Sequence, residues 1–207
     1  MGGAAIADLL FGVAAPSGKL PITFPSMVGQ VPIYYNHKNT GRPPSPDSTV
    51  LIDDIPVRAF QTSFGNTAYH LDAGSDPMWE FGHGLSYVDF EYSNLRTSSD
   101  LLRPGETLQV AVDLSNTGDR AATEVVQLYV RDLVASVTRP VRELKGFRRV
   151  RVEPGQSLTV EFDLDSSDLS FCGRDNRRIV EPGEFHAWVG GSSAAQLRTG
   201  FCLKESK

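Results

Sequence analysis

The heptapeptide Leu108-Gln109-Val110-Ala111-Val112-Asp113-Leu114 decides the fold class of this chain, because its large apolar residues occupy every second position. Strict alternation is typical of a strand with one face in a core and the other face in solvent. Residues 126–130 and 158–164 repeat the pattern. β-Rich composition predicts further strands at residues 147–152, 185–189 and 197–203.

Turn residues separate these segments at regular intervals. Pro104-Gly105, Pro154-Gly155 and Pro182-Gly183 each stand before a predicted strand. Proline presets the first central position of a type II turn, and glycine takes the second, where φ is positive. About seven short strands within roughly 115 residues are typical of an antiparallel β-sandwich. A domain of that size can bury its own core, so we expect residues 88–207 to fold independently.

The first part of the chain offers one short helix. Residues 3–11 predict it, with Ile6, Leu9 and Leu10 as an apolar stripe at helical spacing. A proline-flanked extended segment follows at residues 20–25. One helix and one strand cannot enclose a core. The stripe therefore needs a partner that this part of the chain does not supply.

Residues 26–78 are rich in Pro, Gly, Asn and Asp and show little periodicity. Short strands are expected at residues 50–52 and 57–60, with long irregular loops around them. A stretch of this kind, where it is ordered, is often functional or packs on another body. The expected fold class is therefore mainly β, with an antiparallel sandwich at residues 88–207. It is preceded by residues 1–80, which have one short helix and long irregular loops and are not expected to form a core of their own.

The run Trp79-Glu80-Phe81-Gly82-His83-Gly84-Leu85-Ser86-Tyr87 marks the seam between the two parts. Two glycines one residue apart let the backbone bend, or approach a surface that a Cβ would touch. Aromatic rings around them give the bend apolar area to bury. We predict a junction at residues 81–87, with structural roles for Trp79, Phe81, Gly82, His83, Gly84 and Tyr87.

Composition bounds the classes of function. The 207 residues carry a net charge of −5, so no basic surplus exists to neutralise phosphates, and no nucleic-acid partner is expected. No apolar run is long enough to span a bilayer, and the N-terminus lacks the pattern of a secretory signal. We therefore expect no membrane association. Alternation places one basic cluster on a solvated strand face, namely Arg142, Lys145, Arg148, Arg149 and Arg151.

Cysteine and histidine form no recognisable framework. Cys172 and Cys202 leave either one bridge between neighbouring strands or two free thiols, and we favour two buried free thiols. The four histidines are scattered, and no Cys/His spacing is typical of zinc. We predict no metal site and no cofactor.

Several segments carry a further signal, in a consistent order along the chain. In the first part they are Ala5-Ile6-Ala7-Asp8-Leu9-Leu10-Phe11-Gly12, Pro16-Ser17-Gly18-Lys19-Leu20-Pro21 and Phe81-Gly82-His83-Gly84-Leu85-Ser86-Tyr87. In the β-rich part they are Val125-Val126-Gln127-Leu128-Tyr129-Val130, Arg139-Pro140-Val141-Arg142-Glu143-Leu144-Lys145-Gly146-Phe147 and Glu181-Pro182-Gly183-Glu184-Phe185. Together they resemble the C-terminal end of glycoside hydrolase family 3, the β-glucosidase and β-xylosidase family. Tyr34-Tyr35-Asn36-His37-Lys38-Asn39-Thr40-Gly41-Arg42-Pro43 resembles its bacterial periplasmic β-glucosidase branch in particular.

The resemblance implies that residues 1–80 are the tail of the family's α/β-sandwich domain plus an extended linker. It implies that residues 88–207 are the family's fibronectin type III-like domain. The parent enzyme would hydrolyse terminal β-D-glucosyl residues by a retaining mechanism, with two carboxylates about 5–5.5 Å apart. By the resemblance both carboxylates belong to upstream catalytic domains, on the same or a separate chain, which are the expected partners. The resemblance also implies a periplasmic or secreted location.

Two groups of acidic residues test the expectation that this chain contains no catalytic residue. Asp76 lies in Ser75-Asp76-Pro77, which superficially resembles a nucleophile segment, but it follows Gly74 in a turn-rich loop. Asp53 and Asp54 are adjacent on a predicted extended segment. Their side chains should point to opposite faces and cannot flank one bond. We assign neither group a catalytic role.

The loop from Tyr34 to Arg42 concentrates groups that suit a sugar. Tyrosine rings suit the apolar face of a sugar ring, and Asn, His and Arg suit its hydroxyls. We favour a loop that stacks on a missing domain or a partner subunit, with Arg42 in an ion pair. Contacts at the rim of the sugar site are the alternative, and the candidate rim residues are Tyr34, Tyr35, His37, Lys38, Asn39 and Arg42.

Two other functions remain open. A fibronectin-like sandwich can serve as a carbohydrate-binding or adhesion module. No aromatic row on one face is predicted, however, since Tyr92, Tyr129 and Trp188 occupy strand positions where core packing is expected. The chain can also be one subunit of a split enzyme whose second protein carries the catalytic domains, and this would explain the unpaired helical stripe.

Overall fold

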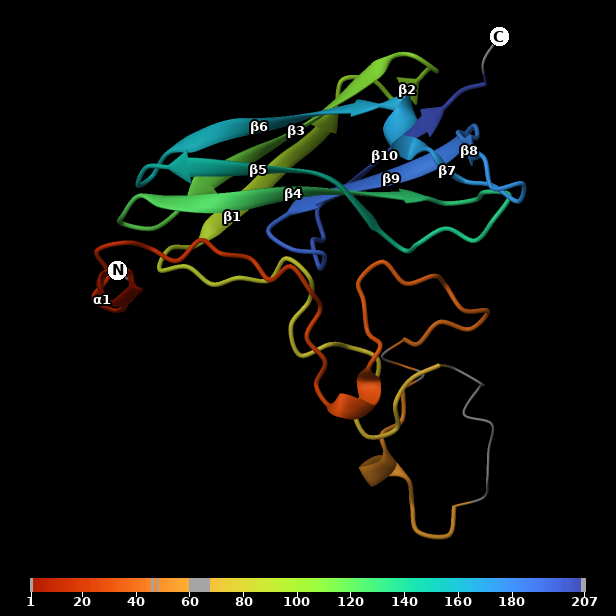
Figure 1. Cartoon of the computed structure of the whole chain (residues 1–207), viewed down its shortest axis with the longest axis horizontal. Helices are drawn as coiled ribbons and strands as arrows, with labels where there is room; N and C mark the ends of the chain where they lie inside the picture. The colour runs from red at the N-terminus through yellow and green to blue at the C-terminus, as the bar shows by residue number, and fades with distance from the viewer. Residues whose placement is uncertain (1, 46, 48, 60–67, 206–207) are drawn as a thin grey trace.

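A computed structural model describes residues 2–45, 47, 49–59 and 68–205, and it contains two β-sheets packed face to face (Figure 1). One sheet has the order β1-β3-β6, formed by β1 (Phe90–Thr97), β3 (Thr107–Asn116) and β6 (Ser157–Asp165). The other has the order β2-β10-β9-β4-β5, formed by β2 (Leu101–Leu102), β4 (Ala122–Asp132), β5 (Glu143–Val152), β9 (Gly183–Gly190) and β10 (Arg198–Leu203). The pairing is antiparallel except between β2 and β10. The predicted antiparallel β-sandwich is confirmed.

The alternating segments all lie in strands, and their apolar positions build the core. Leu108, Val110, Val112 and Leu114 of β3 are at most 1% exposed. They pack in one cluster with residues of the facing sheet, among them Val126, Leu128 and Val130 of β4. Burial of these side chains is the main favourable contribution to folding. The sandwich thus owes its stability to the pattern that predicts it.

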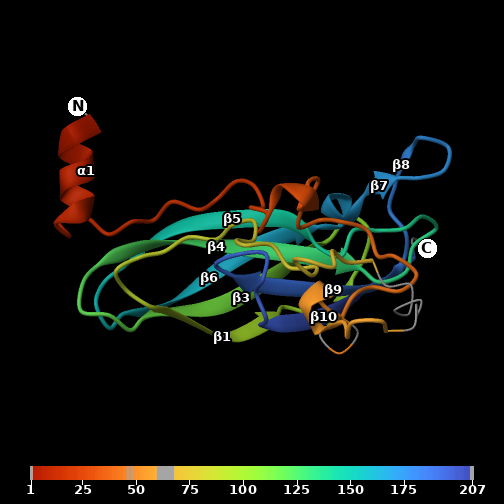
Figure 2. The same cartoon turned by 90° about the horizontal axis from the view of Figure 1, so that it is seen from below.

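Strand β4 departs from the prediction of a half-buried strand. Gln127 and Tyr129 face away from the core cluster, yet they are 3% and 0% exposed. The first part of the chain lies over this outer face of the sheet (Figure 2). Tyr129 is therefore buried as expected, but beneath the junction and not between the sheets.

One predicted turn is wrong. Gly105 and Gly155 have φ of 82° and 67°, as type II turns require. Gly183 instead begins β9 and pairs with Leu203 of β10, so it is an extended strand residue. Strand β1 has no regular alternation, because the register shifts between Ser93 and Arg96.

The helix α1 (Gly2–Leu10) is present where a helix was predicted, and its apolar stripe has no cover within the described residues. Ile6 is 59% and Leu10 is 74% exposed. Figure 2 shows α1 standing clear of the sandwich at one end. No hydrophobic side chain before Val88 is buried among the described residues. The first part of the chain therefore has no core of its own.

The two short strands predicted in the irregular segment are wrong where they can be compared. Residues 52–54 form the 3₁₀ turn η3 (Ile52–Asp54), held by the Ile55 N–H bond to the Ile52 carbonyl. Residues 57–59 form no strand, and Phe60 lies outside the described residues. The Ile52 N–H also donates to the Leu71 carbonyl at 2.7 Å, but this single bond is not continued into a strand pair. Two further 3₁₀ turns are η1 (Val28–Gln30) and η5 (Ser166–Leu169).

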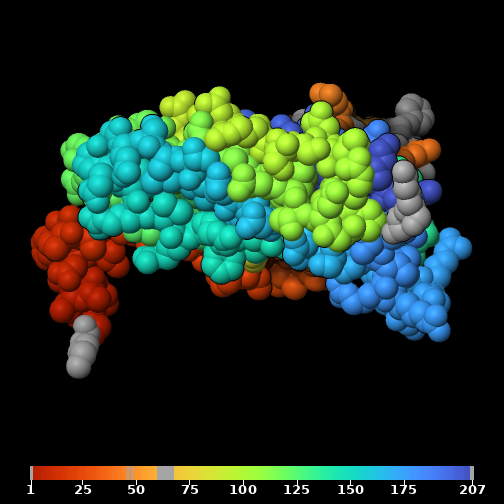
Figure 3. Space-filling view, turned by 90° about the horizontal axis from the view of Figure 1, so that it is seen from above, coloured from red at the N-terminus to blue at the C-terminus, as the bar shows by residue number. Residues whose placement is uncertain are grey.

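The hairpin of β7 (Phe171–Cys172) and β8 (Arg178–Ile179) explains an error about cysteine burial. Both cysteines are free, as favoured, but Cys172 is exposed and Cys202 is half-buried. Figure 3 shows the hairpin projecting from the end of the sandwich opposite to α1. A two-residue strand on such a projection has one face in solvent, so Cys172 is not covered.

The basic cluster around β5 is only partly solvated. Arg148, Arg149 and Arg151 are exposed, whereas Arg142 and Lys145 are half-buried. Arg142 precedes the strand, lies 4.4 Å from the ring centre of Trp188 and donates hydrogen bonds to the carbonyls of Ser193 and Ala195.

None of the helices in the part of the chain that the structure describes is long and apolar enough to cross a membrane.

Candidate functional site: the junction and the loop beside it

Residues 79–83 lie along residues 20–24 and tie the first part of the chain together. The Phe24 N–H donates to the Trp79 carbonyl at 2.8 Å. The Leu20 N–H donates to the His83 carbonyl, and the Gly82 N–H donates to the Leu20 carbonyl, each at 2.8 Å. These bonds satisfy backbone groups that would otherwise lack partners beside the sheet. The junction is therefore a short hydrogen-bonded ladder.

Two glycines bring this ladder into contact with its neighbours. Gly82 has φ of 81°, and a Cβ there would lie 2.2 Å from Oε1 of Gln127. A Cβ on Gly84 would lie 2.4 Å from the Gly18 carbonyl oxygen. Beneath Gly82, the Gln127 amide donates to the Gly191 carbonyl at 2.6 Å and accepts from the Tyr129 hydroxyl at 2.5 Å. A side chain at either glycine would displace these neighbours.

Aromatic rings fill the space between the junction and the sheet. Phe81 stacks on Tyr35 with ring centres 4.4 Å apart, and Tyr35 meets the edge of Tyr129 at 5.7 Å. The Tyr35 hydroxyl also accepts a hydrogen bond from the Leu144 N–H at 3.2 Å. Trp79 packs edge-on against Phe24 at 5.7 Å. Offset and edge-on aromatic pairs contribute about 0.5–1.5 kcal/mol each beyond their buried area.

Glu80 adds a polar anchor. Its carboxylate accepts from the Ser192 hydroxyl at 2.8 Å and lies 3.5 Å from Nδ1 of His83. Burial raises the pKa of Glu80, but hydrogen bonds from its own backbone, Ser192 and His83, together with the charge of His83, outweigh it and lower the pKa below its usual value. The Ser193 N–H donates to the Phe81 carbonyl at 2.9 Å. The described contacts of the His83 side chain are with the Glu80 carboxylate and the Trp79 ring, as expected for a structural residue.

A second ion pair fastens the segment before the junction. Lys19 Nζ lies 2.8 Å from Oε1 of Glu124, and both side chains are largely buried. Tyr92 lies beside Glu124, and its pKa is raised by burial first and then by the Glu124 charge. Tyr87 donates its hydroxyl to the Leu9 carbonyl at 2.7 Å. The first part of the chain is therefore attached to the junction and to the sandwich at several separate side chains.

The loop from Tyr34 to Arg42 borders a cavity of about 470 Å³. Tyr34, His37, Lys38 and Asn39 line it, as four of the six candidate rim residues. Ala68, Tyr69, His70 and Ser75, from a distant part of the chain, also line it, as does Gln30. Its volume falls in the range of about 300–1,000 Å³ typical of small-molecule sites.

Backbone contacts hold this loop against the sandwich. The Val141 N–H donates to the His37 carbonyl at 2.9 Å, and Lys38 pairs with Pro140. Behind the cavity, the Gln30 amide donates to the Asp76 carbonyl at 3.1 Å and accepts from the Ser26 N–H at 2.6 Å. The cavity wall is therefore braced at two places.

Two of the candidate rim residues lie elsewhere. Tyr35 turns from the cavity to stack beneath Phe81, and exposed Arg42 is not part of the cavity lining. Conversely, sequence reasoning missed Tyr69 and His70, although an aromatic and a histidine side by side in an irregular stretch are a usable signal. Residues 69–70 reach the loop only through the folded path of the chain, which no local pattern encodes.

No carboxylate lines this cavity among the residues the structure describes. Asp53 and Asp54 lie in the exposed turn η3, and Asp76 is exposed on a loop. Within the described ranges, no group of three or more His, Cys, Asp or Glu side chains is placed to hold a metal ion. The cavity therefore offers tyrosine rings, two imidazoles, an ammonium and amides.

Comparison with known proteins places both parts of the chain. Residues 1–87 match the glycosyl hydrolase family 3 C-terminal domain, and residues 124–193 match the fibronectin type III-like domain. A periplasmic beta-glucosidase of Salmonella typhimurium is 40% identical over 202 residues, which are 98% of this chain and 25% of that protein. A beta-xylosidase of Formosa agariphila is 37% identical over 193 residues, 93% of this chain and 24% of that protein.

A solved structure gives the same match in three dimensions. The crystal structure of a beta-glucosidase from Listeria innocua in complex with isofagomine superposes with a TM-score of 0.84 at 37% identity. The match covers 98% of this chain and 26% of that chain. The chain thus spans about a quarter of the length of the relatives it matches.

Proposed function

Because this chain belongs to glycoside hydrolase family 3 and corresponds to the C-terminal part of its larger members, we propose that it braces the catalytic domains of a β-glucosidase. In this proposal the parent enzyme hydrolyses terminal β-D-glucosyl residues, and both catalytic carboxylates lie outside this chain. The β-glucosidases among its relatives support that substrate class. A periplasmic or secreted location is proposed from the Salmonella relative.

The composition of the cavity beside the loop carries this proposal. Retaining hydrolysis needs two carboxylates about 5–5.5 Å apart across the scissile bond. The cavity has two tyrosines, two histidines, a lysine and an asparagine, but neither Asp nor Glu among its described lining residues. Such a surface can hold a sugar ring and its hydroxyls without cleaving a glycosidic bond.

We assign the loop a rim role in the whole enzyme. Tyr34 is about half exposed, so one face of its ring is free to stack on a sugar. His37 and Asn39 stand on the same wall. This role depends on catalytic domains that bring the reacting sugar to the cavity, and those domains are the proposed partners. The exposed stripe on α1 is the surface that they would cover, in one chain or as a second subunit.

The sandwich lacks the feature that a carbohydrate-binding or adhesion module would need. Tyr129 and Trp188 are buried, and Tyr92 is half-buried. Phe147 is the exposed aromatic among the described strand residues, so no aromatic row forms on a sheet face. The bracing role is therefore favoured.

Two assays test the proposal. The purified chain, produced in a host without β-glucosidase, should not hydrolyse an aryl β-glucoside. In a protein that also carries the family's catalytic domains, Asn39→Ala should raise KM for cellobiose several-fold with kcat on the aryl glucoside unchanged. Asn36→Ala is the matched control, because Asn36 is exposed and outside the cavity lining.

The assays can fail separately. Turnover by the chain alone would overturn the non-catalytic assignment. Equal kinetics for both asparagine variants would remove the rim role and leave the bracing role standing.

A further inference from the structure

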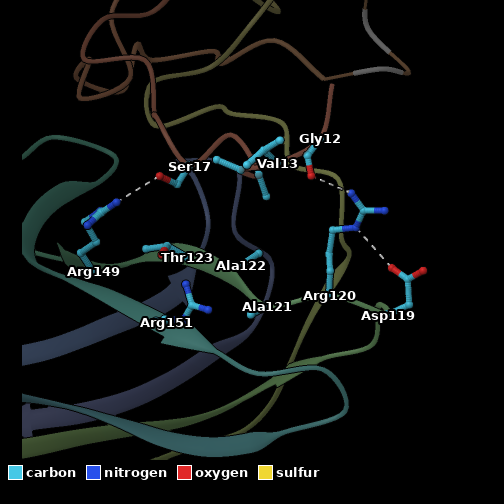
Figure 4. Close-up of a pocket in the computed structure, with 12 residues that line it drawn as sticks. Gly12, Val13, Ser17, Asp119, Arg120, Ala121, Ala122, Thr123, Arg149 and Arg151 are labelled. Atoms are coloured by element: carbon cyan, nitrogen blue, oxygen red, sulfur yellow. Dashed lines mark hydrogen bonds and ion pairs between the residues drawn. The ribbon is translucent and has the colours of Figure 1, made fainter. Parts of the chain in front are cut away.

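A second cavity, of about 620 Å³, lies where the segment after α1 crosses the edge of the sandwich (Figure 4). Residues 12–15 and Ser17 form one wall. The other wall consists of residues 119–123, which lead into β4, and of Arg149 and Arg151 on β5. The cavity is distinct from the one beside the Tyr34 loop, since the two share no lining residue.

Three arginine side chains line this cavity. Arg149 and Arg151 stand two residues apart on β5, so both project from the same face of the strand. Arg120 lies at the other end of the cavity, and its guanidinium points toward Gly12 and Asp119, where Nη1 donates to the Gly12 carbonyl at 3.4 Å (Figure 4). The Arg149 guanidinium donates to the Ser17 hydroxyl at 3.3 Å. Strand β5 and the loop before β4 therefore place three cations around one hollow.

These cations are incompletely neutralised. Asp119 is the one carboxylate among the described lining residues, and it lies 3.4 Å from Nε of Arg120 while 88% exposed. Arg151 pairs with Glu153 outside the cavity at 2.9 Å. Arg149 has no carboxylate partner within the described residues. The lining of this cavity therefore carries a net positive charge, although the whole chain has a net charge of −5.

The other lining groups suit the same kind of ligand. Thr123 and Ser17 contribute hydroxyls that can donate hydrogen bonds. Guanidinium groups bind carboxylate, phosphate and sulfate oxygens through paired N–H donors, and those hydrogen bonds are stronger than bonds between neutral groups. A neutral sugar would gain little from three cations, because its hydroxyls carry no charge to compensate them.

We propose that the cavity lined by Arg120, Arg149 and Arg151 is a binding site for an oxyanion, either a small inorganic anion or the carboxylate of an acidic sugar. The site does not rest on the proposed glycosidase role, since its lining residues take no part in the Tyr34 cavity. An acidic sugar bound there would hold a branched or oxidised polysaccharide against the sandwich. A phosphate or sulfate would instead fasten the segment after α1 to β5.

The test measures binding to the full 207-residue chain by calorimetry and by thermal shift. Phosphate, glucuronate and glucose are titrated separately at constant ionic strength, because salt screens exposed charges. We expect saturable binding of at least one of the two anions and none of glucose. The double variant Arg149→Gln/Arg151→Gln should weaken anion binding at least about tenfold. A preference for glucuronate identifies an acidic sugar, and a preference for phosphate identifies an inorganic anion.

The hairpin of β7 and β8 provides a matched control. Arg174→Gln/Arg177→Gln removes the same charge from exposed positions outside the cavity. It should leave the affinity for the anion unchanged. An equal loss in both double variants would overturn the site, because it would reveal a general charge effect. Absence of saturable binding by phosphate and glucuronate in the unmodified chain would overturn it as well.

Discussion

Replacement of Gly82 by alanine tests whether the junction depends on close approach. With φ of 81°, a non-glycine residue at this position is strained by about 1–2 kcal/mol. The new Cβ would also lie 2.2 Å from Oε1 of Gln127, the atom that accepts the Tyr129 hydroxyl. Moving a buried amide leaves a hydroxyl or carbonyl unpaired, at a cost of about 1–3 kcal/mol. We therefore expect Gly82→Ala to destabilise the docked junction by about 2–5 kcal/mol.

Two measurements separate loss of docking from loss of the sandwich. Urea denaturation reports the global free energy of unfolding. Amide exchange at Leu20 and Ser193 reports the junction, because these N–H groups donate to the His83 and Phe81 carbonyls. If the docked junction is less stable than the sandwich, amide exchange at Leu20 and Ser193 should accelerate sharply. The urea midpoint should then fall by no more than the docked junction contributes to global stability.

Other glycines supply matched controls. Gly105 has φ of 82°, and a Cβ there would meet no neighbouring heavy atom within 4 Å, so Gly105→Ala isolates backbone strain. Gly84→Ala isolates the steric term, through the Gly18 carbonyl. Adding Gln127→Ala to Gly82→Ala should recover part of the loss, and the cycle gives the coupling. The reasoning is refuted if Gly82→Ala costs no more than Gly105→Ala and leaves exchange at Leu20 and Ser193 unchanged.

Two further outcomes follow from the same contacts. Because the folded pKa of Glu80 is lowered, its contribution to docking is present above the usual pKa of 4.5 and is lost as pH falls through the lowered value. The protection factor of the Ser193 amide, which corrects for slower intrinsic exchange in acid, should therefore fall on acidification below about pH 4.5. It should fall less in Glu80→Gln, and identical pH profiles for the two proteins would contradict the assignment. Limited proteolysis should cleave residues 2–75 well before residues 88–205, since the first part buries no hydrophobic side chain among its described residues; equal protection of both, read by mass spectrometry, would contradict it.

The sandwich could be predicted because its information is local. Each of the six strands predicted from residues 108–203 coincides with an observed strand, since alternation records which side faces the core. Tyr92 was expected at a strand position, but the bounds of strand β1 were not predicted, because Asn94, at φ of 52°, and a register shift break its alternation. The turn at Gly183 failed for the opposite reason, since pairing with β10 overrides what the Pro-Gly dipeptide favours locally.

The candidate site depends on contacts that no local pattern records. Tyr34 and His37 share a cavity with Tyr69 and His70 because the Val141 N–H holds the loop against the sandwich, while the Gln30 amide bonds to the Asp76 carbonyl, six residues after His70. Nothing in the composition of residues 34–42 distinguishes Tyr35, which turns to the sandwich, from Tyr34, which faces the cavity. The direction of each side chain is set only when the junction docks.

Strand β4 shows why the junction motif and the sandwich belong together. One face of the strand carries Val126 and Leu128 into the core between the sheets. The other face carries Gln127 and Tyr129, which would be solvent-exposed on an isolated sandwich and are buried only because Gly82 lets the junction lie on them. A buried glutamine whose partners are the Gly191 carbonyl, the Tyr129 hydroxyl and the Gly82 carbonyl is costly unless all of them are in place. Folding of the sandwich therefore favours one position of the junction, and the docked junction in turn holds Tyr35 of the loop between Phe81 and Tyr129.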